Sequence, residues 1–256
     1  YYRASSLEDA VTVLADQTVF KKLLAGGQSL CPMMNFRLVR PDLVIDISRL
    51  KDLLGVEQTS KTVRIGAGVT HAMIEDGIVE GKTGLYLREV AGKIAYRAVR
   101  NRGTIGGSLA HADPAGDWPS ALTAIGARLL VRGPNGSRTV DINEFLEGPF
   151  QTNLNDDEVL LAVELPRLTE AARWAYVKAC QKPGEFAKAI AVTLADKKLH
   201  LYKTVLGARH SNPACLDEIW DGKEESKIDA FLGGSASHER TMHFAALRKA
   251  IAEVQI

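Results

Sequence analysis

Two glycine pairs, each placed after an apolar run, constrain the fold of this chain more than any other feature. Gly26-Gly27 lies in LAGGQSL, Gly106-Gly107 lies in GTIGGSL, and a serine follows within two residues of each pair. Glycine adopts left-handed backbone conformations without strain and has no Cβ to hold a ligand away, so successive N–H groups can converge on an anion such as a pyrophosphate. The sequence therefore favours two loops that hold one phosphate-containing ligand from two sides.

The residues alone leave a second interpretation open, in which the glycine pairs only mark turns. Neither pair is followed by the Lys-Ser/Thr of a P-loop, and neither has the G-x-G-x-x-G spacing of a Rossmann fold. Arg100 and Arg102 precede the second pair, where they either contact phosphate or remain solvated. The spacing of the glycine pairs alone therefore leaves a nucleotide site as one hypothesis beside the turn interpretation.

The first 166 residues predict short helices and strands in alternation. A serine before an apolar set with helical spacing predicts an amphipathic helix over 5–16. The segment 84–95 is also helix-like, and from 122 to 165 the chain resembles strands broken by turns, one of them at 134–136. The earlier runs rich in β-branched and apolar residues predict strands at 21–24, 42–47 and 62–69.

After Pro166 the pattern restarts. Strand-like runs at 175–181, 189–196 and 200–208 are joined by short polar turns, and a helical segment follows at 239–254. This arrangement predicts a separate α+β unit, with a boundary near 166–172. The polar, glycine- and serine-rich segment 221–238 predicts a mobile connection.

Charge and composition exclude several classes of protein. The formal net charge is +1, so the basic excess typical of a nucleic-acid-binding protein is lacking. Apolar runs are shorter than the roughly 18 residues that span a bilayer, and no signal-peptide pattern opens the chain. We therefore expect a cytoplasmic protein with no membrane span and no nucleic-acid partner.

Metal sites are not expected in this chain. Its three cysteines, Cys31, Cys180 and Cys215, cannot supply the four ligands of an all-thiolate iron–sulfur cluster, so any such cluster would lie on another chain. His111 and Asp113 suggest an acid/base pair or two metal ligands, but no third ligand lies at suitable spacing. His111 is therefore expected to support the structure of the loop.

Long runs around both glycine pairs resemble the FAD-binding medium subunit of the molybdenum hydroxylases, a family that includes xanthine dehydrogenase and carbon monoxide dehydrogenase. These runs are LAGGQSLCPMMNFRLVRPDLVIDISRL (24–50) and VRNRGTIGGSLAHADPAGDWPSAL (99–122). Further similarity lies in GPF (148–150), EVLLAVELP (158–166), AYVKACQKPGEFA (175–187) and ERTMHFAALRKA (239–250). The resemblance covers nearly the whole chain.

The resemblance implies an α+β fold in two domains. The first would be a two-subdomain FAD-binding domain of the PCMH/VAO type over 1–166, with subdomains at about 1–53 and 54–166. The second, over 167–256, would be a small α+β domain like that of the carbon monoxide dehydrogenase flavoprotein, with a three-stranded antiparallel sheet plus helices.

The resemblance also implies which residues bind FAD. The first loop would wrap the pyrophosphate, the second would close on it, and Asp117 would contact the ribityl or phosphate portion. Ile94 and Leu160 would lie near the flavin ring with Lys178 as a polar neighbour, and Tyr176 is expected to approach the ring as well. The cofactor-binding residues implied are Ala25, Gly26, Gly27, Gln28, Ser29, Leu30, Ile94, Thr104, Ile105, Gly106, Gly107, Ser108, Asp117, Leu160 and Lys178.

The chain departs from the family pattern at one place in its C-terminal part. Most relatives have Arg-x-Gly-Asp-Phe-Ala where this chain has Gln-Lys-Pro-Gly-Glu-Phe-Ala at 181–187. The change inserts a proline and lengthens the acidic side chain by one methylene group.

The function implied is that of an oxidoreductase subunit with no catalytic side chain assigned to it. A substrate would be hydroxylated at the molybdenum cofactor of a large subunit, and electrons would cross two [2Fe–2S] clusters of a small subunit to the FAD of this chain. From there they would pass to an external acceptor, in a heterotrimer or its dimer. Two alternatives stay open: a non-catalytic scaffold that has lost its flavin, and a stand-alone flavin oxidase of the same superfamily.

Overall fold

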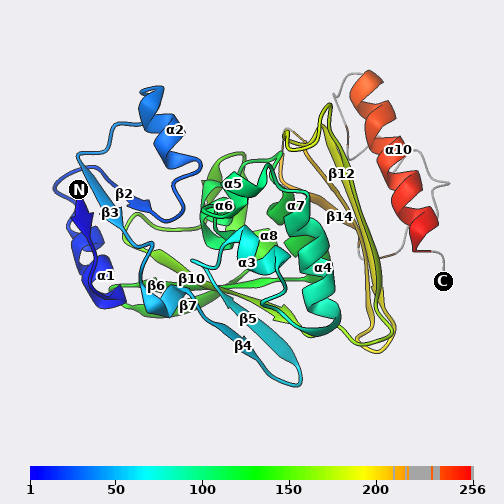
Figure 1. The fold of residues 1–256 in the computed structure, drawn as a ribbon, viewed down its shortest axis with the longest axis horizontal. Coiled ribbons are helices and arrows are strands. Elements are labelled where there is room, and N and C mark those ends of the chain that lie inside the picture. Colours follow the sequence, from blue (N-terminus) through cyan, green and yellow to red (C-terminus); the bar gives the residue numbers. More distant parts are fainter. Residues whose placement is uncertain (210, 217, 219–231, 233–236, 255–256) are drawn as a thin grey trace.

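Three larger sheets follow one another along the chain, and a fourth, two-stranded sheet is a short hairpin (Figure 1). The structure is a computed structural model that describes residues 1–256 except 210, 217, 219–231, 233–236 and 255–256. The connection predicted over 221–238 therefore lies almost entirely outside the described residues.

The first unit is a parallel three-stranded sheet with one helix packed on it. Its strand order is β1-β3-β2, and Ser6 begins helix α1 by accepting a hydrogen bond from the Asp9 N–H, which confirms the helix predicted over 5–16. The elements of this unit are β1 (Tyr2–Arg3), α1 (Leu7–Ala15), β2 (Lys21–Leu24), α2 (Leu30–Asn35), β3 (Leu43–Asp46) and the 3-10 helix η1 (Lys51–Leu53).

The second unit is an antiparallel five-stranded sheet in the order β4-β5-β10-β6-β7, with helices above one of its faces (Figure 1). The central strand β10 pairs with both β5 and β6, which lie far from it in the sequence. Its strands are β4 (Val56–Gln58), β5 (Thr62–Gly66), β6 (Arg128–Gly133), β7 (Gly136–Asp141) and β10 (Val159–Pro166). Its other elements are α3 (His71–Glu75), α4 (Gly81–Gly92), α5 (Arg97–Arg100), α6 (Ile105–His111), α7 (Asp117–Ile125), α8 (Ile142–Phe145) and the hairpin of β8 (Leu146–Gly148) with β9 (Gln151–Thr152).

Two of these helices replace what the sequence indicated as loop or strand. The second glycine pair forms the first turn of α6, which begins at Thr104, rather than an open loop. Helix α7 occupies a region without a predicted helix, and all nine of its residues are buried. Pro119 fits its first turn, where a backbone N–H has no partner within the helix.

The C-terminal sheet has four strands in the order β11-β12-β13-β14, not the three that were predicted. The three predicted strands are present as β11 (Arg173–Ala179), β12 (Ala189–Asp196) and β13 (Leu201–Gly207). The additional strand β14 (Ala214–Leu216) pairs antiparallel with β13, and at three residues it is too short to show an alternating pattern. Helix α10 (Ser237–Glu253) covers the outer face of this sheet (Figure 1).

The largest hydrophobic core continues across the predicted boundary near 166. Helix α7 contacts both β12 and β13, and Trp118 shares a buried cluster with Tyr176 and Ile190 of the C-terminal sheet. A second cluster lies between that sheet and α10, and a third belongs to the N-terminal unit. Among the helices described, none is both long enough and apolar enough to cross a membrane.

Candidate functional site

A cavity of about 840 Å³ is lined by residues from all three units. Small-molecule and cofactor sites in proteins commonly occupy ~300–1,000 Å³, so the space suits a ligand of dinucleotide size. Every residue that the sequence singled out for cofactor binding lines this cavity except Ile105 and Tyr176. Ile105 is fully buried in the large hydrophobic core, because the helical turn of α6 directs it inward.

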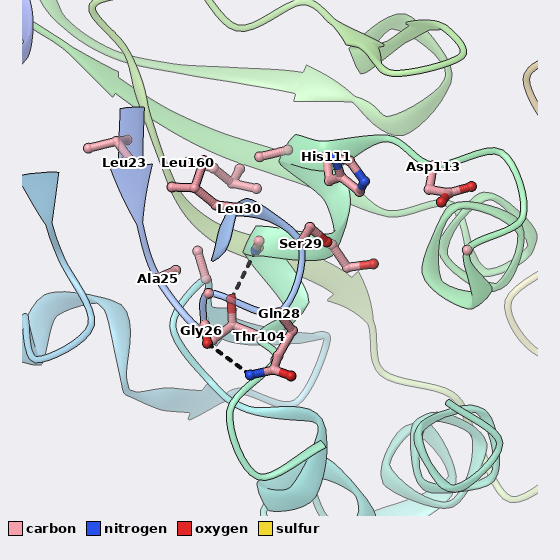
Figure 2. A pocket seen from close by; sticks show the side chains of 18 of the residues that line it. Leu23, Ala25, Gly26, Gln28, Ser29, Leu30, Thr104, His111, Asp113 and Leu160 are labelled. Carbon is pink, nitrogen blue, oxygen red and sulfur yellow. Dashed lines mark hydrogen bonds between the residues drawn. The ribbon is translucent and has the colours of Figure 1, made fainter. Parts of the chain in front are cut away.

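The loop between β2 and α2 forms one wall of the cavity (Figure 2). Gly27 has a φ of 73°, in the left-handed region that favours glycine. Gly26 is required for a different reason: a Cβ there would lie 2.0 Å from the Arg102 carbonyl oxygen. In the described part of the chain, no acceptor bonds the N–H groups of Gly26, Gly27, Gln28 or Ser29. The loop therefore presents four successive N–H donors that a bound anion could satisfy.

The second glycine pair does not present such donors, which corrects the expectation of a backbone clamp with N–H groups on both sides. The four N–H groups from Ile105 to Ser108 donate to Val69 O, Ala67 O, Thr104 Oγ1 and Thr104 O, at 2.9–3.0 Å. Gly106 is required because a Cβ would lie 2.3 Å from that of Ala67. A Cβ on Gly107 would meet Thr104 Oγ1 at 2.8 Å and Ala25 Cβ at 3.9 Å. The pair thus allows α6 to pack closely against the strand below and against the first loop.

A buried ion pair lies in another wall of the cavity. Lys178 Nζ donates to Asp117 Oδ2 at 3.0 Å, and the two side chains are only 5% and 6% exposed. Tyr176 Oη donates to Asp117 Oδ1 at 2.6 Å. Burial raises the pKa of the Asp117 carboxyl, while the Lys178 ammonium and the Tyr176 hydroxyl oppose that rise. Tyr176 is fully buried and supports Asp117 from the core side, so it is absent from the cavity lining where the ring was expected to meet it.

Arg100 turns away from the cavity. Its guanidinium donates to the Glu75 carboxylate at 2.8 and 2.9 Å and to the carbonyl oxygens of Ile94 and Ala95 at 2.8 and 3.0 Å. Ala95 has a φ of 39°, unusual for a residue with a side chain, and both Ile94 and Ala95 line the cavity. Arg100 therefore stabilises the turn that brings Ile94 to the site, whereas Arg102 itself lines the cavity.

His111 and Asp113 both line the cavity, and Figure 2 shows Asp113 farther from the first loop than His111. The His111 ring packs against Phe150, with ring centroids 5.2 Å apart, and burial lowers the pKa of this histidine. Across the described ranges of the chain, no group of three histidine, cysteine or acidic side chains is arranged to hold a metal ion.

The segment 181–187, where the chain departs from the family pattern, also reaches the cavity. Gly184, Glu185 and Phe186 line it, and Gly184 has a φ of 89°. A Cβ on Gly184 would lie 2.7 Å from the Tyr96 ring. Proline and glycine here form a tight turn against Tyr96, which keeps Phe186 at the cavity although its side chain is largely exposed.

His71 is a residue of the site that the sequence did not single out. It lines the cavity, is 5% exposed, and its Nδ1 accepts a hydrogen bond from Trp118 Nε1 at 3.1 Å. Burial lowers the pKa of His71 to about 4. No local signal could have revealed it, because its indole partner lies 47 residues away in a helix that was itself not predicted.

The low pKa of His71 makes the stability of the fold dependent on pH. The unfolded chain takes up a proton near pH 6.5 and the folded chain only near pH 4, so stability falls as the pH falls between these values. We expect the free energy of unfolding to fall by an amount on the order of 2–3 kcal/mol across this pH range. Urea unfolding at about pH 7 and about pH 4.5 measures it, with His71→Leu as the variant that cannot titrate. An equal pH dependence in both proteins would contradict the assignment.

A family model described as the FAD binding domain in molybdopterin dehydrogenase matches residues 1–168. The carbon monoxide dehydrogenase medium chain of Hydrogenophaga pseudoflava is 40% identical over 190 residues, which cover 74% of this chain and 66% of that one. The glyceraldehyde dehydrogenase medium chain of Sulfolobus acidocaldarius is 36% identical over 225 residues, covering 86% of this chain and 78% of that one.

Solved structures of similar enzymes also match this chain in fold. A chain of the Hydrogenophaga pseudoflava carbon monoxide dehydrogenase that lacks the Mo-pyranopterin moiety of its cofactor matches with a TM-score of 0.89 and 29% identity, over 99% of this chain and 96% of that chain. A chain of quinoline 2-oxidoreductase from Pseudomonas putida 86 matches with a TM-score of 0.84 and 28% identity, over 99% and 95%. The fold, the unpaired N–H groups and these relatives agree, and the chain belongs to the family of FAD-binding medium subunits of the molybdenum hydroxylases.

Proposed function

We propose that this chain is the electron-transfer subunit of a molybdenum hydroxylase complex. It takes electrons from the [2Fe–2S] clusters of a small partner subunit, after a substrate has been oxidised at the molybdenum cofactor of a large subunit, and passes them to an external acceptor. We infer a heterotrimer or its dimer, located in the cytoplasm. The division into 1–166, with subdomains 1–53 and 54–166, and 167–256 is part of the proposal, and it is supported because each of the three ranges contains one of the three larger sheets.

The observation that carries the proposal is the row of unpaired N–H groups at Gly26, Gly27, Gln28 and Ser29. These partly exposed N–H groups have no acceptor within the described chain and are left to water or a ligand, and a pyrophosphate supplies several acceptor oxygens in a small space. We assign the pyrophosphate of FAD to this loop, from Ala25 to Leu30. Thr104, Gly106, Gly107 and Ser108 lie opposite and limit its position by close packing rather than by N–H donors.

The flavin end of the site is assigned to the walls formed by Ile94, Leu160, Asp117 and Lys178. FAD supplies the redox chemistry when it is bound. The two aliphatic side chains exclude water, and Asp117 fixes the Lys178 ammonium at 3.0 Å in a buried position. A fixed positive charge in such a place favours the addition of electrons to a neighbouring cofactor.

Two measurements test the proposed function. The purified chain, alone or in its complex, should show flavin absorbance and release FAD on heating, and a colourless chain would instead indicate the scaffold alternative. Without oxygen, substrate should bleach the flavin of the intact complex. It should not bleach the flavin of a preparation that lacks the iron–sulfur subunit. Bleaching of the isolated chain by substrate would indicate a stand-alone oxidase and overturn the proposal.

A further inference from the structure

The position of His71 places one ring nitrogen at the cavity. Its backbone N–H donates to the Gly103 carbonyl oxygen at 2.9 Å, and a Cβ on Gly103 would lie 2.8 Å from both Nε2 and Cδ2 of the ring. The Nε2 edge therefore packs over Gly103. Because His71, Gly103 and Thr104 all line the cavity, this edge lies beside the start of helix α6.

Trp118 determines which nitrogen of His71 carries the proton. The indole N–H can only donate, so His71 Nδ1, at 3.1 Å from Trp118 Nε1, must accept and must be unprotonated. A neutral imidazole then has its hydrogen on Nε2. The Trp118 side chain is fully buried and has no freedom to release this hydrogen bond without loss of packing.

The Nε2–H group has no acceptor within the part of the chain that the structure describes. Fully buried side-chain nitrogens and oxygens without a partner there belong to Lys21, Ser120, Thr123 and Thr193, and His71 Nε2 is not among them. It therefore retains access to the cavity. His243 provides a contrast, because both of its ring nitrogens are paired, with Glu239 O at 2.9 Å and Gly207 O at 3.0 Å.

The neighbourhood of Nε2 indicates which part of a ligand it meets. Gly103 adjoins both His71 and the first glycine loop, since a Cβ on Gly103 would lie 2.8 Å from His71 Nε2 and a Cβ on Gly26 would approach Gly103 Cα to 2.9 Å. Nε2 thus lies in the part of the cavity next to the four unpaired N–H groups. The acceptor expected in that part is an anionic oxygen.

We propose that His71, fixed by Trp118 in its Nε2–H tautomer, donates a hydrogen bond to a pyrophosphate oxygen of FAD. This inference rests on the proposed FAD site and adds to it a side-chain donor. The donor is neutral, so His71 contributes direction and specificity for an oxygen acceptor without adding a buried charge. Trp118 acts as a positioning residue behind it.

The first test follows the imidazole itself and needs no variant that must fold. In the apo chain labelled with ¹⁵N-histidine, His71 should show a protonated Nε2 and an unprotonated Nδ1. Addition of FAD or of ADP, which shares the diphosphate, should shift the Nε2–H resonance and slow its exchange with water. Riboflavin, which has no phosphate, should leave it unchanged. A resonance that neither FAD nor ADP moves would overturn the inference.

The second test measures affinity with a rescue. His71→Leu should weaken the binding of both FAD and ADP roughly ten- to a hundredfold, the usual effect of losing a hydrogen bond to a charged group. His71→Gln, whose amide nitrogen reaches the place of Nε2, should recover most of that loss. Weaker FAD binding with unchanged ADP binding would overturn the assignment to the pyrophosphate.

An absent FAD site and an absent His71 contact give different experimental results. If the wild-type chain binds no FAD, the proposed function itself is wrong. If the wild-type chain binds FAD while His71→Leu binds it equally well and the Nε2 signal does not move, only the role of His71 is wrong.

Discussion

Gly26→Ala is expected to weaken FAD binding by at least roughly a hundredfold, since the loss of two hydrogen bonds to a charged group is already enough for that effect. The added Cβ would lie 2.0 Å from the Arg102 carbonyl oxygen and 2.9 Å from Gly103 Cα. Both contacts are to backbone, which cannot rotate away, so the loop must move and its N–H groups must leave the positions in which they meet the pyrophosphate. Fluorescence titration of the apo chain with FAD measures the change in Kd.

Gly55→Ala is the matched control for this prediction. It makes the same chemical change at a position where a Cβ meets nothing within 4 Å, and it should bind FAD with wild-type affinity. Circular dichroism of both apo variants shows whether the fold is retained. A folded Gly26→Ala protein with an unchanged Kd would contradict the role assigned to the first loop.

Asp117→Asn is expected to lower the free energy of unfolding by about 3 kcal/mol, within the range found when one partner of a buried ion pair is removed. The substitution leaves the Lys178 ammonium in a place with 5% exposure and without its counter-charge. Lys178 keeps neutral acceptors, the Lys93 carbonyl oxygen at 3.0 Å and the side-chain oxygen that asparagine retains, which places the effect at the lower end of that range. Urea unfolding of the apo chain at neutral pH measures the change.

A second substitution separates charge from packing. Asp117→Asn combined with Lys178→Met removes the unpaired ammonium and should recover a large part of the lost stability. Glu57→Gln serves as the exposed control, because Glu57 is 75% exposed where it faces Arg64 at 3.6 Å and should contribute no more than about 1 kcal/mol. Equal losses for Asp117→Asn and Glu57→Gln would show that burial does not strengthen the Asp117–Lys178 pair.

The sequence predicted those parts of the fold whose signals are local. Ser6 and the apolar spacing after it predicted α1, and strand-like runs of β-branched and apolar residues predicted β5 and β12. Helix α7 was missed because its apolar C-terminal half falls in the stretch from 122 onward that predicted strands, and burial on all sides leaves it no exposed polar face. The strand β14 was missed because three residues are too few to establish a period.

In the candidate site, too, only the features with a local sequence signal could be predicted. The glycine pairs were recognisable because close packing and left-handed backbone require glycine at Gly26 and Gly27 whatever lies elsewhere in the chain. The sequence could not show that the N–H groups of Ile105 and Gly106 are already bonded, since their acceptors at Val69 and Ala67 lie some forty residues earlier. Likewise, nothing near His71 indicates that Trp118 determines its tautomer.

The contact between α7 and the C-terminal sheet determines at which stage of synthesis the cofactor site is complete. Lys178 and Tyr176, which complete the wall around Asp117, lie on β11, and β11 has no strand to pair with until β12 has been synthesised; β12 in turn is completed by β13. A nascent chain that already carries both glycine pairs therefore still has an open site and an exposed α7. Cofactor loading must wait until the chain has emerged past β13, so flavin supply stabilises the finished chain and cannot guide its early folding.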